Sequence, residues 1–115
     1  MKNIDELNLN EREKRAIAEA SRILKKRFPV KEVILFGSKA RGDDDEESDI
    51  DLMLLTTRSI HWKERHTIID ALFDIGIDHD VIFSILDTTV SEFENGIFST
   101  FPIHEEITRD GVATT

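Results

Sequence analysis

The chain has 115 residues, of which 39% are hydrophobic, and this length suits a single domain built around one core. It contains no cysteine, which excludes a disulfide framework, and its net charge of -9 argues against a broad nucleic-acid surface without excluding a nucleotide bound through magnesium. No apolar stretch reaches the ~20 residues that cross a membrane and the first residues lack a signal peptide's apolar segment, so we expect a soluble, cytoplasmic protein.

The first predicted element is a long helix that begins after Asn10. Asn10 is suited to be its N-cap, and Glu13 stands where the second residue of a capping box is expected. Apolar residues then recur at helical spacing on one face: Ile17, Ala20, Ile23 and Leu24. The helix is expected to end near Phe28, because Pro29 disfavours helical geometry in the residue before it.

The middle of the chain predicts two strands joined by a short helix and a loop. The apolar run 33–36 predicts a buried strand, which Gly37 interrupts. A helical turn is expected over 38–41, closed by Gly42, and the acidic run 43–47 is expected to be a solvated loop. The second strand is expected over 49–55.

The last part of the chain predicts alternating helices and one strand. Ser59 is the expected cap of a helix over 60–75, which Gly76 would end. The buried stripe of that helix is predicted to comprise Ile69, Leu72 and Phe73. A third strand is expected over 81–86, followed by a short helix that begins with a capping box over 89–92. The final helix is expected to have Ser99 or Thr100 as its cap, Pro102 in its first turn, Ile103 and Ile107 buried, and Gly111 at its end. We therefore predict one α/β (α+β) domain over 1–115, with a small mixed sheet and helices mainly on one face.

The turn at Gly37 and Ser38 has features of a phosphate site. A strand that turns into a helix exposes backbone N–H groups, and glycine allows a ligand to approach them closely. The Ser38 hydroxyl can donate to a phosphate oxygen, and Lys39 or Arg41 can add positive charge. Such turns are also common for structural reasons alone, so this motif does not establish a function by itself.

Asp49 and Asp51 predict a metal site. Side chains alternate along a strand, so these two carboxylates share one face, while Ile50, Leu52 and Leu54 share the core face. Two unit charges at about 4 Å repel by about 4 kcal/mol at an effective dielectric of ~20, and a divalent cation between them removes that repulsion. The alternative for an isolated pair is a polar strand face open to water.

The two motifs together predict phosphoryl or nucleotidyl transfer, because they place a phosphate site beside a metal site. The segments GSKARG (37–42) and SDIDL (48–52) resemble those of minimal nucleotidyltransferase domains of the DNA polymerase β-type superfamily. The tail segment FPIHEEITRDGV also resembles the closing helix of these small proteins. The resemblance implies a nucleotidyltransferase fold.

By this resemblance, Gly37 and Ser38 hold the nucleotide triphosphate, and Asp49 and Asp51 bind Mg²⁺. The family has a third carboxylate on a later strand, which completes the metal site and acts as base. Asp80, directly before the third predicted strand, is the candidate. Asp78 is the alternative, since it has the same parity on an extended segment, whereas Asp74 lies too early, within the predicted helix.

The resemblance also implies ATP as donor and a hydroxyl group as acceptor of AMP. Relatives include antitoxins that transfer adenylyl groups to HEPN-domain toxins, which makes a HEPN toxin the leading candidate partner. Two alternatives remain at this point. The chain could neutralise its partner by binding without catalysis, or it could modify a small molecule.

Overall fold

The computed structural model describes residues 2–43 and 49–114, so residues 44–47 of the predicted acidic loop lie outside the described part. The strands are β1 (Lys2–Asn3), β2 (Val30–Phe36), β3 (Ile50–Thr56), β4 (Phe83–Thr89) and β5 (Val112–Ala113). The α-helices are α1 (Glu11–Arg27), α2 (Gly37–Arg41), α3 (Trp62–His79), α4 (Val90–Asn95) and α5 (Pro102–Asp110). Two 3-10 helices are η1 (Ile4–Glu6) and η2 (Ile97–Thr100).

The strands form one mixed sheet with the order β1-β5-β2-β3-β4. The central pair β2 and β3 is antiparallel, and its register places Phe36 opposite Asp51. The pair β3 and β4 is parallel, connected through α3, and its register places Asp51 beside Ser84. The C-terminal strand β5 pairs with both β2 and β1, so it extends the sheet beyond β2 and leaves β1 as the edge strand.

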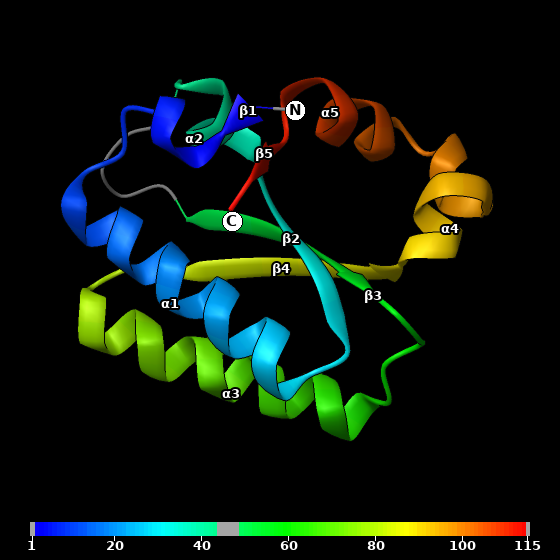
Figure 1. Cartoon of the computed structure of the whole chain (residues 1–115), viewed down its shortest axis with the longest axis horizontal. Coiled ribbons are helices and arrows are strands. Elements are labelled where there is room, and N and C mark those ends of the chain that lie inside the picture. The colour runs from blue at the N-terminus through cyan, green and yellow to red at the C-terminus, as the bar shows by residue number, and fades with distance from the viewer. Residues whose placement is uncertain (1, 44–48, 115) are drawn as a thin grey trace.

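The two long helices α1 and α3 cover one face of the sheet, whereas α5 lies on the other face (Figure 1). The larger core lies under α1 and α3 and contains Leu35 and Leu52 from the sheet together with Leu24 and Ile68 from the helices. A smaller core on the opposite face contains Met53 and, from α5, Ile107. This arrangement confirms the predicted small mixed sheet with helices mainly on one face.

The N-terminal helix follows the sequence prediction closely. The Asn10 side chain accepts a hydrogen bond from the Glu13 N–H at 2.7 Å, and the Glu13 carboxylate accepts one from the Asn10 N–H at 3.1 Å. This is the predicted capping box, and it satisfies two N–H groups at the start of the helix. The helix ends before Phe28, which has extended backbone geometry, as Pro29 predicts.

Helix α3 differs from its prediction at both ends. It begins at Trp62 with His61 as its cap, so the predicted cap Ser59 is wrong. It also continues past Gly76 to His79, so the predicted end at Gly76 is wrong. Gly76 is buried inside the helix, and its carbonyl oxygen accepts a hydrogen bond from the N–H of Asp80. The left-handed residue that ends the helix is Asp80, with a φ of 56°.

The buried face of α3 also differs from the prediction. Leu72 is buried as expected, but Ile69 and Phe73 are 46% and 67% exposed. Ile68 and Ile75 occupy the core instead. The reason is that apolar residues occur on more than one side of this helix, so periodicity alone does not identify the side that meets the sheet.

The remaining boundaries differ by a few residues. The strand β2 begins at Val30, and β4 begins at Phe83, two residues after the predicted start at Val81. Thr89 caps α4 by accepting a hydrogen bond from the Glu92 N–H at 3.1 Å, as predicted.

The helix α5 begins at Pro102 with Phe101 as its cap, so the predicted caps Ser99 and Thr100 are wrong; both lie in η2. Ile107 is buried and Ile103 is partly buried, and Gly111 follows the helix, as predicted.

None of the helices in the described ranges combines the length and apolar character that a membrane span requires.

Candidate active site

The chain turns sharply where β2 ends. Gly37 has a φ of 75°, a conformation that favours glycine, and it starts the five-residue helix α2. Gly42, with a φ of 81°, ends α2, and its N–H donates to the carbonyl oxygen of Ser38 at 2.9 Å. The predicted order of strand, Gly-Ser turn, short helix and closing glycine is therefore confirmed.

Gly37 lies directly against Asp51. The register places Asp51 opposite Phe36, the residue before Gly37, on the neighbouring strand. A Cβ atom added to Gly37 would overlap the carboxylate of Asp51. The turn and the carboxylate thus occupy one place in the fold, and a side chain at position 37 would separate them.

Asp51 lies on the face predicted from alternation. Ile50, Leu52 and Leu54 are buried in the core under α1 and α3, whereas Met53, which shares the face of Asp51, belongs to the opposite core. Asp49 directly precedes β3, and its charge contributes to the electrostatic environment of Asp51. Asp51 therefore faces away from the long helices, towards the side of α5.

The pKa of Asp51 is raised above its ordinary value, mainly because partial burial disfavours its charged form. The charges of Asp49 and Glu106 raise it further, and the Arg41 guanidinium opposes them. A site whose carboxylates repel each other in this way is stabilised by a cation. Oxygen ligands from one or two carboxylates, completed by water and substrate phosphates, are what Mg²⁺ prefers, so Asp49 and Asp51 fit this ion.

Arg41, at the end of α2, points its guanidinium towards three acidic groups. Its Nε donates to Asp43 at 3.2 Å, and its Nη1 donates to Glu106 of α5 at 2.7 Å. Its charge also reaches Asp51. The hydrogen bond to Asp43 is the main cause of the raised pKa of Arg41. A guanidinium remains charged at any ordinary pH, so Arg41 is a permanent cation near Asp51.

Glu106 is the residue of this site that sequence reasoning missed. It lies in the segment 101–112, yet nothing in its spacing connects it with Arg41, which is 65 residues earlier. Only the packing of α5 against α2 brings the two together. No linear pattern in the sequence identifies this contact.

Lys39 has a different position from Arg41. Its side chain is 1% exposed, and its ammonium group forms an ion pair with Glu13, the capping-box residue of α1. It therefore connects α2 to α1 within the protein. Of the two basic residues predicted to add charge at the turn, Arg41 is the one near Asp51.

Asp80 does not lie where its predicted role requires it. It ends α3, its side chain is 94% exposed, and its carboxylate is 3.6 Å from the guanidinium of Arg12 on α1. The position on β4 beside Asp51 is occupied by Ser84. The alternatives Asp78 and Asp74 lie within α3 and are exposed. Over residues 2–43 and 49–114, no three acidic or histidine side chains converge to hold a metal, so this geometry provides two carboxylates rather than three.

Residues 18–101 match the family model described as "Polymerase beta, Nucleotidyltransferase", which is well over half of the chain. Two proteins of Methanocaldococcus jannaschii are also similar. "Putative protein adenylyltransferase MJ0141" is 44% identical over 52 residues, or 45% of this chain, and "Putative protein adenylyltransferase MJ1379" is 49% identical over 41 residues, or 36% of this chain. These matches cover 52% and 41% of the two relatives, so the chain spans about half the length of the curated relatives it matches.

Two solved structures have the same fold. One, described as a toxin-antitoxin with AMP-PNP, has a TM-score of 0.60 and 16% identity, and the match covers 89% of this chain and 72% of that chain. The other, described as a "putative nucleotidyltransferase from Sulfolobus solfataricus", has a TM-score of 0.52 and 23% identity, covering 87% and 77%. At this identity the likeness concerns the fold, which is that of the nucleotidyltransferases.

Proposed function

Because this chain belongs to the polymerase beta nucleotidyltransferase family, we propose that it transfers AMP from ATP to a hydroxyl group of a partner protein, with Mg²⁺ as cofactor. The leading candidate for the partner is a HEPN-domain toxin, which would make the chain an antitoxin that acts by adenylylation. The names of the two M. jannaschii proteins support adenylyl transfer to a protein, and the description of one structural neighbour as a toxin-antitoxin with AMP-PNP supports a toxin as the partner; the HEPN class rests on the family resemblance of the sequence.

One observation carries the proposal: Gly37, in the turn after β2, lies directly against the carboxylate of Asp51. A phosphate group held by the backbone at Gly37 and the hydroxyl of Ser38 would lie beside Asp51. Arg41 would add positive charge to the bound triphosphate. For this it would exchange part of its present hydrogen bonding with Asp43 and Glu106 for phosphate oxygens.

In the reaction, the acceptor oxygen forms a bond to the α-phosphorus of ATP. The bond from that phosphorus to the oxygen that bridges it to the β-phosphate breaks, pyrophosphate leaves with the bonding electron pair, and the hydroxyl proton passes to solvent water. Mg²⁺ held by Asp49 and Asp51 would neutralise phosphate charge and lower the pKa of the attacking hydroxyl. The role of Asp49, Asp51 and the turn is to place the reacting groups in line.

The proposal uses two carboxylates and does not include Asp80 as the third. Asp80 is exposed and paired with Arg12, and Ser84 stands beside Asp51 on β4. The base role that the family resemblance implies for Asp80 therefore has no support from its position. A comparison of Asp80→Asn with Asp51→Asn tests this directly. Asparagine has nearly the size of aspartate, and it also tolerates the left-handed backbone conformation found at position 80.

The experiment is to incubate the protein with labelled ATP, Mg²⁺ and the product of the adjacent gene, as the candidate partner. We expect AMP on the partner, detected as a mass increase. We expect Asp51→Asn to reduce the rate by about 100-fold or more, equivalent to ~2.7 kcal/mol of barrier. Asp80→Asn should stay within about tenfold of the wild type if that residue acts only at the end of α3.

Two results would contradict the proposal in different ways. If the partner is never labelled while wild type and Asp51→Asn neutralise it equally, the chain acts by binding alone. If label appears on a small compound when no partner protein is present, the acceptor is a small molecule.

A further inference from the structure

A groove runs between α3 and the start of β4, and it is open on the outside of the molecule. Its volume is about 810 Å³. Its lining is largely apolar and includes Ile69, Phe73 and Ile77 from α3, together with Ile82 and Ile50 from the sheet side. None of these five residues is among those assigned above to the site around Gly37. We call this feature the α3–β4 groove.

The apolar side chains of this groove are unusually exposed. Phe73, Ile77 and Ile82 are 67%, 64% and 66% exposed. Of the eight large apolar side chains that are exposed in the described part of the chain, four line this groove: Ile69, Phe73, Ile77 and Ile82. Single exposed apolar residues are ordinary on a protein surface, but a contiguous group usually marks a place where another molecule binds.

A row of acidic side chains runs beside this apolar surface. Asp70, Asp74 and Asp78 are exposed and follow one another at intervals of four residues, so they form a line along one side of α3. Each directly follows one of the apolar residues at 69, 73 and 77. Asp80, with a side chain 94% exposed, lines the groove at the end of α3.

The basic groups near the groove do not balance this row. Arg12 lies at the groove's end and is within 3.6 Å of Asp80. His66 Nε2 lies 3.9 Å from the carboxylate of Asp70, at the start of the row, whereas no basic group of the described residues makes such a contact with Asp74 or Asp78; Lys63 lies further towards the start of α3. A second copy of this chain would bring another acidic row and another net charge of -9 to the same surface, which is electrostatically unfavourable. An apolar segment flanked by lysine or arginine is complementary to it.

We propose that the α3–β4 groove docks an amphipathic helix of a partner protein, with apolar residues on one face and basic residues beside them. The inference rests on the proposed function only in identifying that partner as the adenylyl acceptor. Ile50, which lines the groove, lies between Asp49 and Asp51, and its N–H donates to the carbonyl oxygen of Ile82 at 2.8 Å. A chain docked there would thus reach the start of β3, next to Asp49 and Asp51 along the chain, although the Asp51 side chain lies on the opposite face of the sheet.

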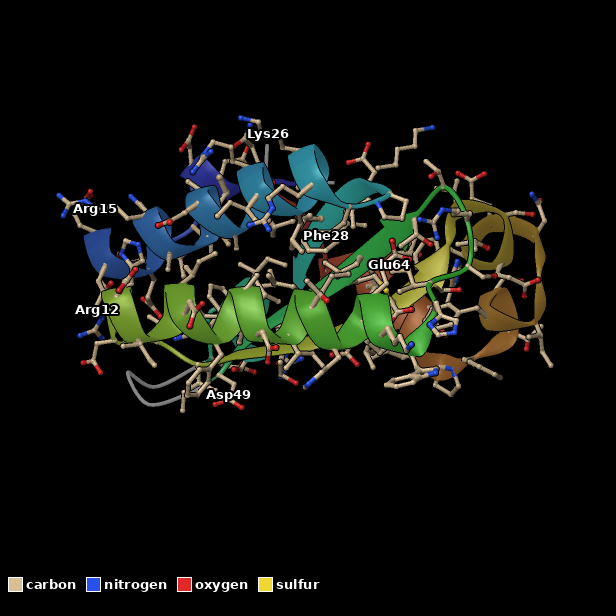
Figure 2. All side chains as sticks on the ribbon, turned by 90° about the horizontal axis from the view of Figure 1, so that it is seen from below. Arg12, Arg15, Lys26, Phe28, Asp49 and Glu64 are labelled. Carbon is tan, nitrogen blue, oxygen red and sulfur yellow. The ribbon has the colours of Figure 1, made fainter. Side chains whose placement is uncertain are left out.

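Figure 2 views the molecule from the side of the two long helices, with α1 and α3 beside each other. Arg12 is labelled where the start of α1 and the end of α3 lie together, and Asp49 is labelled on the side of α3 away from α1. The exposed side of α3 is not covered by another element of the described chain, which agrees with the exposure of Phe73 and Ile77.

The test uses two designed, fluorescently labelled amphipathic peptides with the same leucine face, one flanked by lysine and one by glutamate. Binding to the full chain is followed by fluorescence anisotropy without ATP or Mg²⁺. We expect the lysine peptide to bind and the glutamate peptide to bind at least about tenfold more weakly, because the flanking charges alone differ. Rising salt should weaken the lysine peptide's binding.

Matched variants then locate the site. Phe73→Ser should weaken lysine-peptide binding by about tenfold or more, since a central aromatic residue usually dominates such contacts. Ile97→Ser is the control, because Ile97 is 69% exposed but lies in η2, outside the groove. Asp74→Asn should weaken binding, whereas Glu94→Gln, an exposed acid on α4, should not.

Three results would overturn the inference. The lysine peptide could fail to bind, the two peptides could bind equally, or Ile97→Ser could weaken binding as much as Phe73→Ser. Sedimentation of the free protein adds a fourth test: a dimer that Phe73→Ser converts to a monomer would assign the groove to a second copy.

Docking and transfer can be judged separately. Asp51→Asn should bind the lysine peptide as the wild type does, because binding requires no catalysis. If Phe73→Ser loses lysine-peptide binding but AMP transfer to the partner proceeds unchanged, the groove does not dock the adenylyl acceptor, while the proposed function stands. If the peptide binds as expected but no AMP is transferred to any acceptor, the proposed function fails and the docking surface stands.

Discussion

Gly37 and Gly42 stand at the two ends of α2 with nearly the same backbone conformation, at φ angles of 75° and 81°. They differ in their surroundings. A Cβ at position 37 would overlap the carboxylate of Asp51, whereas a Cβ at position 42 would have nothing within 4 Å. Comparing the two positions therefore separates the backbone requirement from the requirement for close approach.

We expect Gly37→Ala and Gly42→Ala to lose a similar ~1–2 kcal/mol of stability through the left-handed backbone, with a further loss at position 37 from the overlap. Only Gly37→Ala should also abolish nucleotide binding, because its methyl group displaces Asp51 from the turn. Urea denaturation and ATP titration in the presence of Mg²⁺ measure the two effects. Equal nucleotide affinity in both variants would show that contact between Gly37 and Asp51 is not needed.

The raised pKa of Asp51 has a consequence for stability. Its carboxyl group binds a proton more tightly in the folded chain than in the unfolded chain, where its pKa is near the ordinary 3.8. The folded state therefore binds more protons in the window between these two pKa values, and the free energy of unfolding falls as pH rises through it. Asp51→Asn removes this part of the pH dependence in the metal-free protein.

NMR titration of the Asp51 carboxyl carbon should resolve the causes. We expect Asp49→Asn to lower the pKa of Asp51, and Glu106→Gln to lower it by less, because Asp49 has the larger effect. Arg41→Gln should raise it, since the guanidinium stabilises the carboxylate. Mg²⁺ with nucleotide should lower it. A pKa that rises in Asp49→Asn would contradict the close approach of the two carboxylates.

At the scale of elements, α2 is held between two helices by its basic residues. Lys39 pairs with Glu13 of α1, and both side chains are buried, with 1% and 8% exposure. Arg41 pairs with Glu106 of α5 in a more exposed position. The short helix that carries the glycine turn is thus connected to α1 through a buried ion pair and to α5 through a partly exposed one.

Removing one member of a buried ion pair leaves the other charge without compensation, which typically costs about 3–5 kcal/mol. We expect Lys39→Met to lower the free energy of unfolding by this amount. Adding Glu13→Gln should recover part of the loss, because no buried charge then remains and the capping acceptor is kept. Urea denaturation measures both.

Lys14→Met is the control for this pair. Lys14 is on α1, the helix of Glu13, and its ammonium group lies 4.0 Å from the carboxylate of Glu11. The side chain of Lys14 is 38% exposed and that of Glu11 is 76% exposed. Such a pair contributes at most ~1 kcal/mol. If Lys14→Met and Lys39→Met destabilise equally, burial is not what makes the Lys39–Glu13 pair important.

At the scale of the whole molecule, an acidic chain is expected to bind a polyanion only together with a cation. The net charge is -9, and the candidate site itself contains two adjacent aspartates. ATP without Mg²⁺ should therefore bind poorly, because both the body and the site repel it. The ion would change the sign of this interaction at Asp49 and Asp51.

We expect Mg²⁺ and ATP together to raise Tm, since a ligand at about 100 times its Kd adds ~2.7 kcal/mol to the folded state, equivalent to several degrees for a domain of this size. ATP alone should produce little change. Asp49→Asn should reduce the rise, because one of the two oxygen donors to the metal is lost. Differential scanning fluorimetry measures the shift, and no change at millimolar Mg²⁺ and ATP would argue against a formed site.

The sequence by itself determined the elements whose causes are local. The capping box at Asn10 and Glu13 begins α1, Pro29 limits it, and Gly42 ends α2. Alternation along β3 placed Asp51 on the face opposite Ile50 and Leu52, because successive side chains of a strand point to opposite faces. These features depend on residues a few positions apart, so a linear pattern contains the information.

The tertiary structure alone decided the rest of the candidate site. The apolar residues of α3 occur on more than one side of the helix, so they do not determine which side meets the sheet. In the folded chain Phe73 lies on an exposed side. Helix α3 also continues past Gly76, and Asp80 at its end lies beside Arg12 rather than beside Asp51. The contact of Glu106 with Arg41 arises where α5 packs on α2, and interactions between distant segments of this kind leave no periodic signal in the sequence.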